Sequence, residues 1–210
     1  TRESATTASN GFDAAGATTA LSSSVIIGYS AASDSNITNA ADGTVAVGYQ
    51  SLKALTSGEF NLAVGYLAGT ALTTGDGNIT IGHQAGKALV LGSSNTVIGV
   101  NALLACVGHD ASDAGRYNVC VGRDTMGAAN GNHDDCEIDG NVAIGNGALY
   151  SGTLSGGVDL LGNIAIGAEA MDATATNAQT GTIAIGYQSL TALTTGAYNT
   201  AIGYNACKTY

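Results

Sequence analysis

The sequence of 210 residues contains no Trp and no Pro, and it has only six Lys and Arg residues in total. Much of the hydrophobic share of 45% is Ala, which leaves few bulky side chains for a conventional globular core. Stacked repeats need fewer, because each coil buries itself on its neighbours. No run of about 18 apolar residues occurs, so we expect no membrane insertion. With a formal net charge of −10, the chain lacks the cations on which nucleic-acid binding depends.

Sequence motifs that carry catalysis are also missing. There is no Gly-x-Ser-x-Gly elbow, no phosphate-binding loop, no metalloprotease His pair and no dinucleotide fingerprint. The three histidines, His83, His109 and His133, share no spacing. We therefore expect neither an enzyme nor a bound cofactor.

One six-residue phrase recurs along the chain, and its glycine serves as the anchor for aligning the copies. The phrase reads Asn-Leu-Ala-Val-Gly-Tyr at 61–66 and Asn-Thr-Ala-Ile-Gly-Tyr at 199–204, and clean copies lie 17 residues apart, as from Gly48 to Gly65. A short fixed period with occasional insertions predicts an all-β, parallel β-solenoid of about ten coils. The anchor glycines are Gly28, Gly48, Gly65, Gly82, Gly99, Gly122, Gly145, Gly167, Gly186 and Gly203.

The residues before each anchor glycine alternate in size. Ile or Val always precedes the glycine, as at Val64, and a β-branched residue or Leu usually stands two positions earlier, as at Leu62. A small residue such as Ala63 lies between them. This alternation with a period of two predicts a short strand. We expect the large side chains to fill the interior of the coil and the small face to let another backbone approach closely.

A second segment follows each anchor glycine, as at residues 49–55. The repeat is too short for a strand, a helix and two turns, so we predict a second strand here. A second set of glycines is expected to turn the chain again, in the left-handed conformation that is free of strain only for glycine. These glycines are Gly58, Gly75, Gly92, Gly115 and Gly196.

Two further columns of residues follow from the alignment. Asn occupies one corner of most coils, where stacked amides are expected to form a hydrogen-bonded ladder: Asn61, Asn78, Asn95, Asn118, Asn141, Asn163 and Asn199. Tyr or His often follows the anchor glycine, at Tyr29, Tyr49, Tyr66, His83, Tyr187 and Tyr204. The rings either cover the turn as an amphipathic ladder or stack on sugars.

The longer copies carry insertions near residues 109–113, 130–135 and 155–159, which are expected to project as loops suited to recognition. Residues Asp134, Asp135, Glu137 and Asp139, beside His133, offer oxygen ligands for a hard cation such as calcium. They lack the spacing of a known calcium loop, so we interpret them as a solvated acidic loop and expect no metal.

The four cysteines are Cys106, Cys120, Cys136 and Cys207. No C-x-x-C pair occurs, which argues against a zinc site. Disulfides and buried thiols both remain open, and Cys207 is a candidate for pairing with another chain.

Residues 1–23 carry no anchor phrase. We interpret them as an N-terminal arm, either flexible or docked on a neighbouring subunit, followed by a repeat domain over residues 24–210.

The phrase Asn-x-Ala-Ile-Gly, present at 141–145, 163–167 and 199–203, resembles the head repeats of trimeric autotransporter adhesins. The longer stretch at 184–206 is similar to repeats of phage tail fibres. The resemblance implies a left-handed β-roll, three chains packed around an axis, and an attachment role outside the cell, on a cell surface or virion. Its partners would be further copies of the chain and a surface glycan or host receptor.

Two functions are compatible with these observations. The first is a trimeric fibre segment used for surface or host attachment. The second is a subunit that polymerises end to end into an extracellular filament, an interpretation based on the polar N-terminal arm, the absence of capping elements and Cys207.

Overall fold

The computed structural model describes residues 8–11, 23–33, 37, 41–104, 115–127, 137–150, 159–172, 179–193 and 196–208. Over these ranges the chain is all-β and winds as a parallel β-solenoid, as the repeats predicted. The described part contains no helix, and hence none that could span a membrane.

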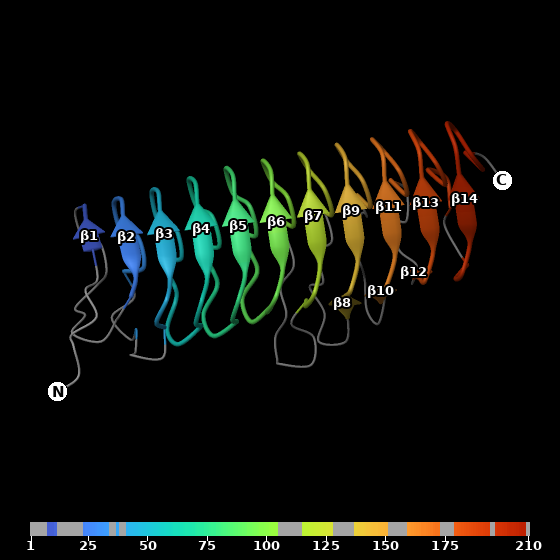
Figure 1. Ribbon diagram of the computed structural model, residues 1–210. Coiled ribbons are helices and arrows are strands. Elements are labelled where there is room, and N and C mark those ends of the chain that lie inside the picture. Colours follow the sequence, from blue (N-terminus) through green and yellow to red (C-terminus); the bar gives the residue numbers. More distant parts are fainter. Residues whose placement is uncertain are drawn as a thin grey trace.

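Eleven strands form one parallel sheet along the length of the molecule (Figure 1). Consecutive coils pair without a register shift, so that Leu62 lies opposite Ile79 and Ala63 opposite Thr80. The strands are β1 (Ala8–Asn10), β2 (Val25–Ile27), β3 (Val45–Val47), β4 (Leu62–Val64), β5 (Ile79–Ile81), β6 (Thr96–Ile98), β7 (Val119–Val121), β9 (Val142–Ile144), β11 (Ile164–Ile166), β13 (Ile183–Ile185) and β14 (Thr200–Ile202).

A second, smaller parallel sheet lies just before the Asn corner. It consists of β8 (Ile138–Asp139), β10 (Leu160–Leu161) and β12 (Gln179–Thr180), in the order β12-β10-β8.

The prediction that the large Ile and Val side chains fill the interior is wrong. The middle residue of each strand points inward instead: Ala63 is fully buried, whereas its neighbours Leu62 and Val64 are only half-buried. The space inside is filled from the opposite wall by leucines such as Leu55 and Leu72, both fully buried. At Ala63 those leucines leave room for only a small side chain on the strand, because protein interiors pack to a fixed density.

The packing of the interior varies from coil to coil. Gly69 holds the position in its coil that Leu52 holds in the coil before it, and a Cβ at Gly69 would lie 2.9 Å from Cδ2 of Leu52, so Leu52 fills the space that Gly69 leaves open along the stack. Where the strand residue is the larger Thr80, the opposing position is Gly86, whose Cβ would meet Thr80 Cγ2 at 2.8 Å. Large residues therefore lie beside small ones, along the stack at Leu52 and Gly69 and across the interior at Thr80 and Gly86.

The segment after the anchor glycine is a run of turns, so the second strand predicted at residues 49–55 is also wrong. Gln50 and Leu52 adopt left-handed backbone conformations, with φ of 51° and 48°. Their amides still bond to neighbouring coils, Gln50 N–H to Tyr29 O at 2.8 Å and Leu52 N–H to Ala68 O at 3.0 Å. Inter-coil hydrogen bonds thus satisfy this wall without regular strand geometry.

The anchor glycines adopt a φ that side chains rarely reach, +134° at Gly82 for example. A Cβ there would lie 2.4 Å from the carbonyl oxygen of Gly99 in the next coil. Both the conformation and the close approach of the two backbones therefore require glycine at this turn.

The second set of glycines behaves less uniformly than predicted. Gly115 is left-handed, but Gly58 and Gly75 are not. A Cβ on Gly58 would meet the Gly75 carbonyl oxygen at 2.3 Å, so close packing, and not conformation, explains that glycine. The left-handed residue at this corner is the one before the Asn position, such as Phe60 with φ of 56°.

Within the N-terminal segment, the described residues 8–10 belong to the main sheet. Ala8–Asn10 forms strand β1, which pairs in parallel with β2, and Gly11 adopts the anchor conformation with φ of +142°. Sequence alignment missed this strand because Asn10 stands where every other copy has Ile or Val.

Candidate functional site: an apolar sheet face and an aromatic ladder

Six of the seven predicted corner asparagines form one buried column. In each step the side-chain amide of one residue donates to the amide oxygen of the previous one, as from Asn78 Nδ2 to Asn61 Oδ1 at 3.0 Å. The same oxygen accepts the backbone N–H of Asn78 at 2.9 Å. The column comprises Asn61, Asn78, Asn95, Asn118, Asn141 and Asn163.

Thr182 separates the column from Asn199. Its backbone N–H donates to Asn163 Oδ1 at 3.0 Å, but its hydroxyl is buried without a partner. The column therefore stabilises the stack and presents no group to a ligand.

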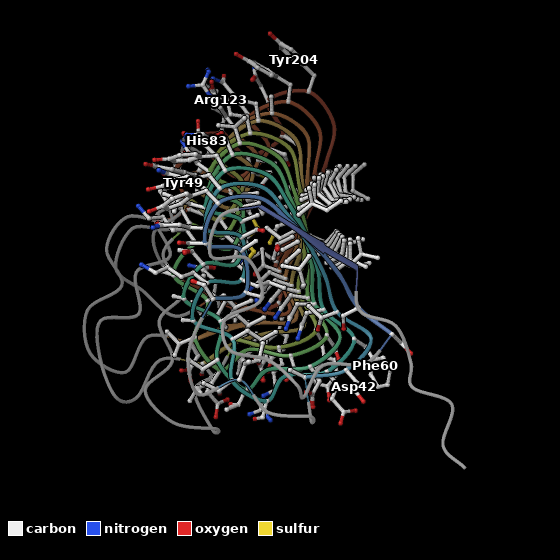
Figure 2. All side chains as sticks on the ribbon, turned by 90° about the vertical axis from the view of Figure 1, so that its left-hand side faces the viewer. Asp42, Tyr49, Phe60, His83, Arg123 and Tyr204 are labelled. Carbon is white, nitrogen blue, oxygen red and sulfur yellow. The ribbon has the colours of Figure 1, made fainter. Side chains whose placement is uncertain are left out.

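The inward Ala positions leave the large aliphatic side chains on the outside of the main sheet. Figure 2 shows them as two rows of carbon-only side chains projecting from the sheet. We call this surface the outer sheet face. It comprises Val25, Ile27, Val45, Val47, Leu62, Val64, Ile79, Ile81, Thr96, Ile98, Val119, Val121, Val142, Ile144, Ile164, Ile166, Ile183, Ile185, Thr200 and Ile202.

The outer sheet face is flat, continuous and uncharged. Apart from Thr96 and Thr200 all its members are aliphatic, and the most exposed include Ile27 at 44% and Ile202 at 67%. At the register positions of Val25 and Ile27, strand β1 carries Ala8 and Asn10. Monomeric soluble proteins rarely expose a large continuous apolar patch, so such a surface marks an interface.

The ring residues after the anchor glycines form an aromatic ladder on another side of the solenoid, where Figure 2 labels Tyr49, His83 and Tyr204. Tyr29, Tyr49, Tyr66 and His83 stack in sequence, with ring centroids 5.1–5.4 Å apart and planes within 10° of parallel. The ring faces of Tyr49 and Tyr66 therefore lie against neighbouring rings, and the ring edges face solvent.

The ladder is interrupted in the middle of the molecule. Val100, Arg123, Asn146 and Ala168 occupy the equivalent positions there. It resumes at Tyr187 and Tyr204, whose centroids are 5.3 Å apart.

A row of mostly polar residues accompanies the ladder one position further along the chain in each coil, with Leu67 and Gly147 as the exceptions. Gln50 and Gln84 are half-buried, Asn101 Nδ2 donates to Asp124 Oδ1 at 3.0 Å, and Gln188 Nε2 donates to Glu169. Burial, together with the Glu169 carboxylate, raises the pKa of Asp172 above its usual value.

The candidate cation ligands do not converge in the part of the chain that is described. Asp134 and Asp135 lie outside the described residues, as do the insertions at 109–113 and 130–135 and all of the insertion at 155–159 except Asp159. Glu137 is exposed, while Asp139 accepts a hydrogen bond from Arg116 N–H at 2.6 Å. No group of three acidic, His or Cys side chains comes together among the described residues.

The structure describes two of the four cysteines. Cys120 is buried, with its Sγ 3.2 Å from Sδ of Met126, and Cys207 is an exposed thiol. Cys106 and Cys136 lie outside the described residues.

Comparison with protein-family models, with curated proteins and with solved structures gave no match to this chain. The function must therefore be argued from the surfaces themselves.

Proposed function

We propose that the chain is a non-enzymatic fibre protein that associates as a homotrimer. In this assembly the outer sheet faces of three left-handed β-rolls, each of about ten coils, pack around a common axis. The single observation that carries the proposal is the continuous apolar face on the outside of the main sheet.

The partner for this face must be apolar, straight and repetitive over the same length. Each coil offers the same pair of side chains in unbroken register, so a matching partner repeats at the strand spacing of about 4.8 Å. A second copy of the same face meets these conditions without further assumptions. Closed symmetry then limits the assembly to a small number of copies.

The energetics favour association. Most side chains of the outer sheet face are already half-buried, so completing their burial contributes on the order of 1 kcal/mol each. Eighteen of the twenty positions are aliphatic, the other two being Thr96 and Thr200. At about 1 kcal/mol each, the aliphatic positions together contribute roughly 18 kcal/mol, which is above the roughly 4–15 kcal/mol cost of association.

The attachment role rests on the resemblance to adhesin heads and tail-fibre repeats and on the rod-like stack of coils. We place the protein outside the cell, on a cell surface or virion, where the fibre holds the particle or cell to a host surface. A surface glycan or a host receptor is the partner at the exposed sides.

Sedimentation and negative-stain electron microscopy of the purified protein test the assembly. We expect a mass three times that of the 20.6 kDa chain and discrete rods of fixed length. Filaments of indefinite length would support the end-to-end polymer instead, and a stable monomer would contradict both proposals.

A pair of matched variants tests the interface. Val64→Lys combined with Ile81→Lys places two charges on the outer sheet face and is expected to give monomers. Thr74→Lys, at an exposed position off that face, is the control and leaves the trimer intact. Circular dichroism distinguishes a folded monomer from a chain that does not fold.

A further inference from the structure

The first four rungs of the aromatic ladder form a straight edge with regularly spaced polar groups. Because the ring faces of Tyr49 and Tyr66 are covered by neighbouring rings, a sugar cannot stack on them from outside. What these residues offer to solvent is the ring edge and a phenolic hydroxyl, which both donates and accepts hydrogen bonds. Tyr49 is 41% exposed and Tyr66 47%.

Side-chain amides lie beside these hydroxyls. Within the described part of the chain, the amides of Gln50 and Gln84 bond to no other side chain or backbone group, and so remain available to a ligand. Leu67 stands between them in the row. The edge therefore combines hydroxyl and amide groups with a small apolar patch.

The backbone of the same edge is fully engaged between coils. Leu67 N–H donates to Tyr49 O at 2.9 Å, and Gln84 N–H donates to Tyr66 O at 2.8 Å. A peptide partner therefore cannot add here as an extra strand, which requires unpaired backbone groups.

The absence of charge along this edge argues against a charged ligand. No charged side chain occurs in the ladder from Tyr29 to His83 or in the row from Ser30 to Gln84. A polyanion would need clustered Lys or Arg, and the whole chain carries a net charge of −10. The ligand must therefore be neutral, rich in hydroxyls and extended along the stack.

We propose that the edge formed by Tyr29, Tyr49, Tyr66, His83, Gln50 and Gln84 binds an extended, uncharged β-1,4-linked polysaccharide laid along the solenoid axis. The rings repeat every 5.1–5.4 Å, and such a polysaccharide advances by a similar distance with each sugar. One polar rung then meets each sugar unit, and many weak contacts add up along the chain.

This site rests on the proposed attachment function and names its ligand class. In Figure 2, Tyr49 and His83 point away from the side on which the two carbon-only rows project. The edge therefore stays exposed when the outer sheet faces pack together, and a trimer presents three such edges.

The test uses the full chain with cellohexaose and chitohexaose as probes and with cellobiose and an α-1,6-linked dextran oligosaccharide as comparisons. Because the protein has no Trp, the intrinsic fluorescence of its nine Tyr residues reports binding directly, and calorimetry confirms it. We expect at least one hexasaccharide to bind at least tenfold more tightly than cellobiose and the dextran. If neither hexasaccharide binds, the proposal is overturned.

The variant Tyr49→Phe combined with Tyr66→Phe separates recognition from structure. The rings and their stacking remain, so we expect an unchanged melting temperature but at least tenfold weaker binding of the hexasaccharide. Tyr117→Phe with Tyr198→Phe, off the ladder, is the control that keeps full affinity. Equal binding by both variants would overturn the proposal. Sedimentation of the same samples shows separately whether the trimer has formed.

Discussion

At the scale of single residues, the anchor glycines set the geometry of the stack. From Gly28 to Gly186, each combines a positive φ with close contact to the carbonyl of the anchor glycine in the next coil, so both the backbone conformation and the lack of space require glycine. Substitutions at glycines that meet only one of these conditions separate the two effects.

Gly82→Ala is expected to lower the free energy of unfolding by at least about 3 kcal/mol, because strain and a backbone clash add. The added Cβ would lie 2.4 Å from Gly99 O. Gly162→Ala is the matched control: its φ is +63°, but nothing lies within 4 Å of the added Cβ. We expect that variant to lose about 1 kcal/mol. Equal losses in urea denaturation would contradict the role of close backbone packing.

The Asn column predicts a stabilising substitution. Thr182→Asn would continue the column, because its amide nitrogen can donate to Asn163 Oδ1 and its oxygen can accept the N–H of Asn199. We expect a gain of about 1 kcal/mol in unfolding free energy. Thr182→Val, which removes a hydroxyl that has no partner, should change stability little. A Thr182→Asn protein less stable than the wild type would contradict this account of the column.

Asp172 predicts a pH effect. Its pKa in the folded state is raised above the ordinary value of 3.8, so the folded state binds this proton more tightly than the unfolded state does. Its contribution to stability is therefore greatest at low pH and is lost as the pH rises through the raised pKa. Asp172→Asn should raise the melting temperature at pH 7 and leave it nearly unchanged at pH 3. A decrease at pH 7 would contradict the assignment.

At the scale of elements, the sequence predicted the strands well and their orientation poorly. Period-two alternation marks a strand such as β4 whichever face points inward. Ala63 is compatible with either side, since it is apolar and small. The opposite wall decides the matter, because Leu55 and Leu72 occupy the interior, and a strand-by-strand analysis does not include that wall.

The sequence did not predict the turns after the anchor glycine, for a related reason. Non-glycine residues such as Gln50 and Leu52 adopt left-handed conformations there, which local propensity disfavours. Inter-coil hydrogen bonds outweigh that preference, and they exist only once the coils are stacked. The alignment of the repeats predicted the aromatic ladder itself, but the covering of its ring faces depends on how closely the coils stack.

The inward orientation of the Ala positions predicts opposite responses at adjacent residues. Ala63→Val places two methyl groups into a filled interior and should cost about 1–3 kcal/mol of stability. Val64→Ile adds one methylene to the outer sheet face and should leave stability unchanged or raise it. Thermal denaturation compares the stability of the two variants. If Val64→Ile were the more destabilising, the large strand residues would have to point into the interior.

At the scale of the whole molecule, the solenoid separates two sides with different chemistry. The outer sheet face is apolar and continuous, whereas the aromatic ladder is polar and interrupted between Val100 and Ala168. In the proposed trimer the first side holds the copies together and the second remains in contact with the surroundings.

If the trimer is the stable form, its melting temperature depends on protein concentration by mass action. Dilution by a factor of one hundred should lower the melting temperature measurably for the wild type. The Val64→Lys, Ile81→Lys variant should melt at a temperature independent of concentration. A wild-type melting temperature that does not change on dilution would indicate that the single chain is already the folded unit.

The in-register stacking of the Asn column has a consequence for evolution. Successive amides 17 residues apart make the same contacts, and each coil touches only the coils directly above and below it. Duplicating or deleting one such unit in the gene would therefore join surfaces that already fit. The length of the solenoid can therefore change by one coil at a time while the contacts between coils stay the same. Natural selection can then adjust the length of the protein and its surface chemistry independently.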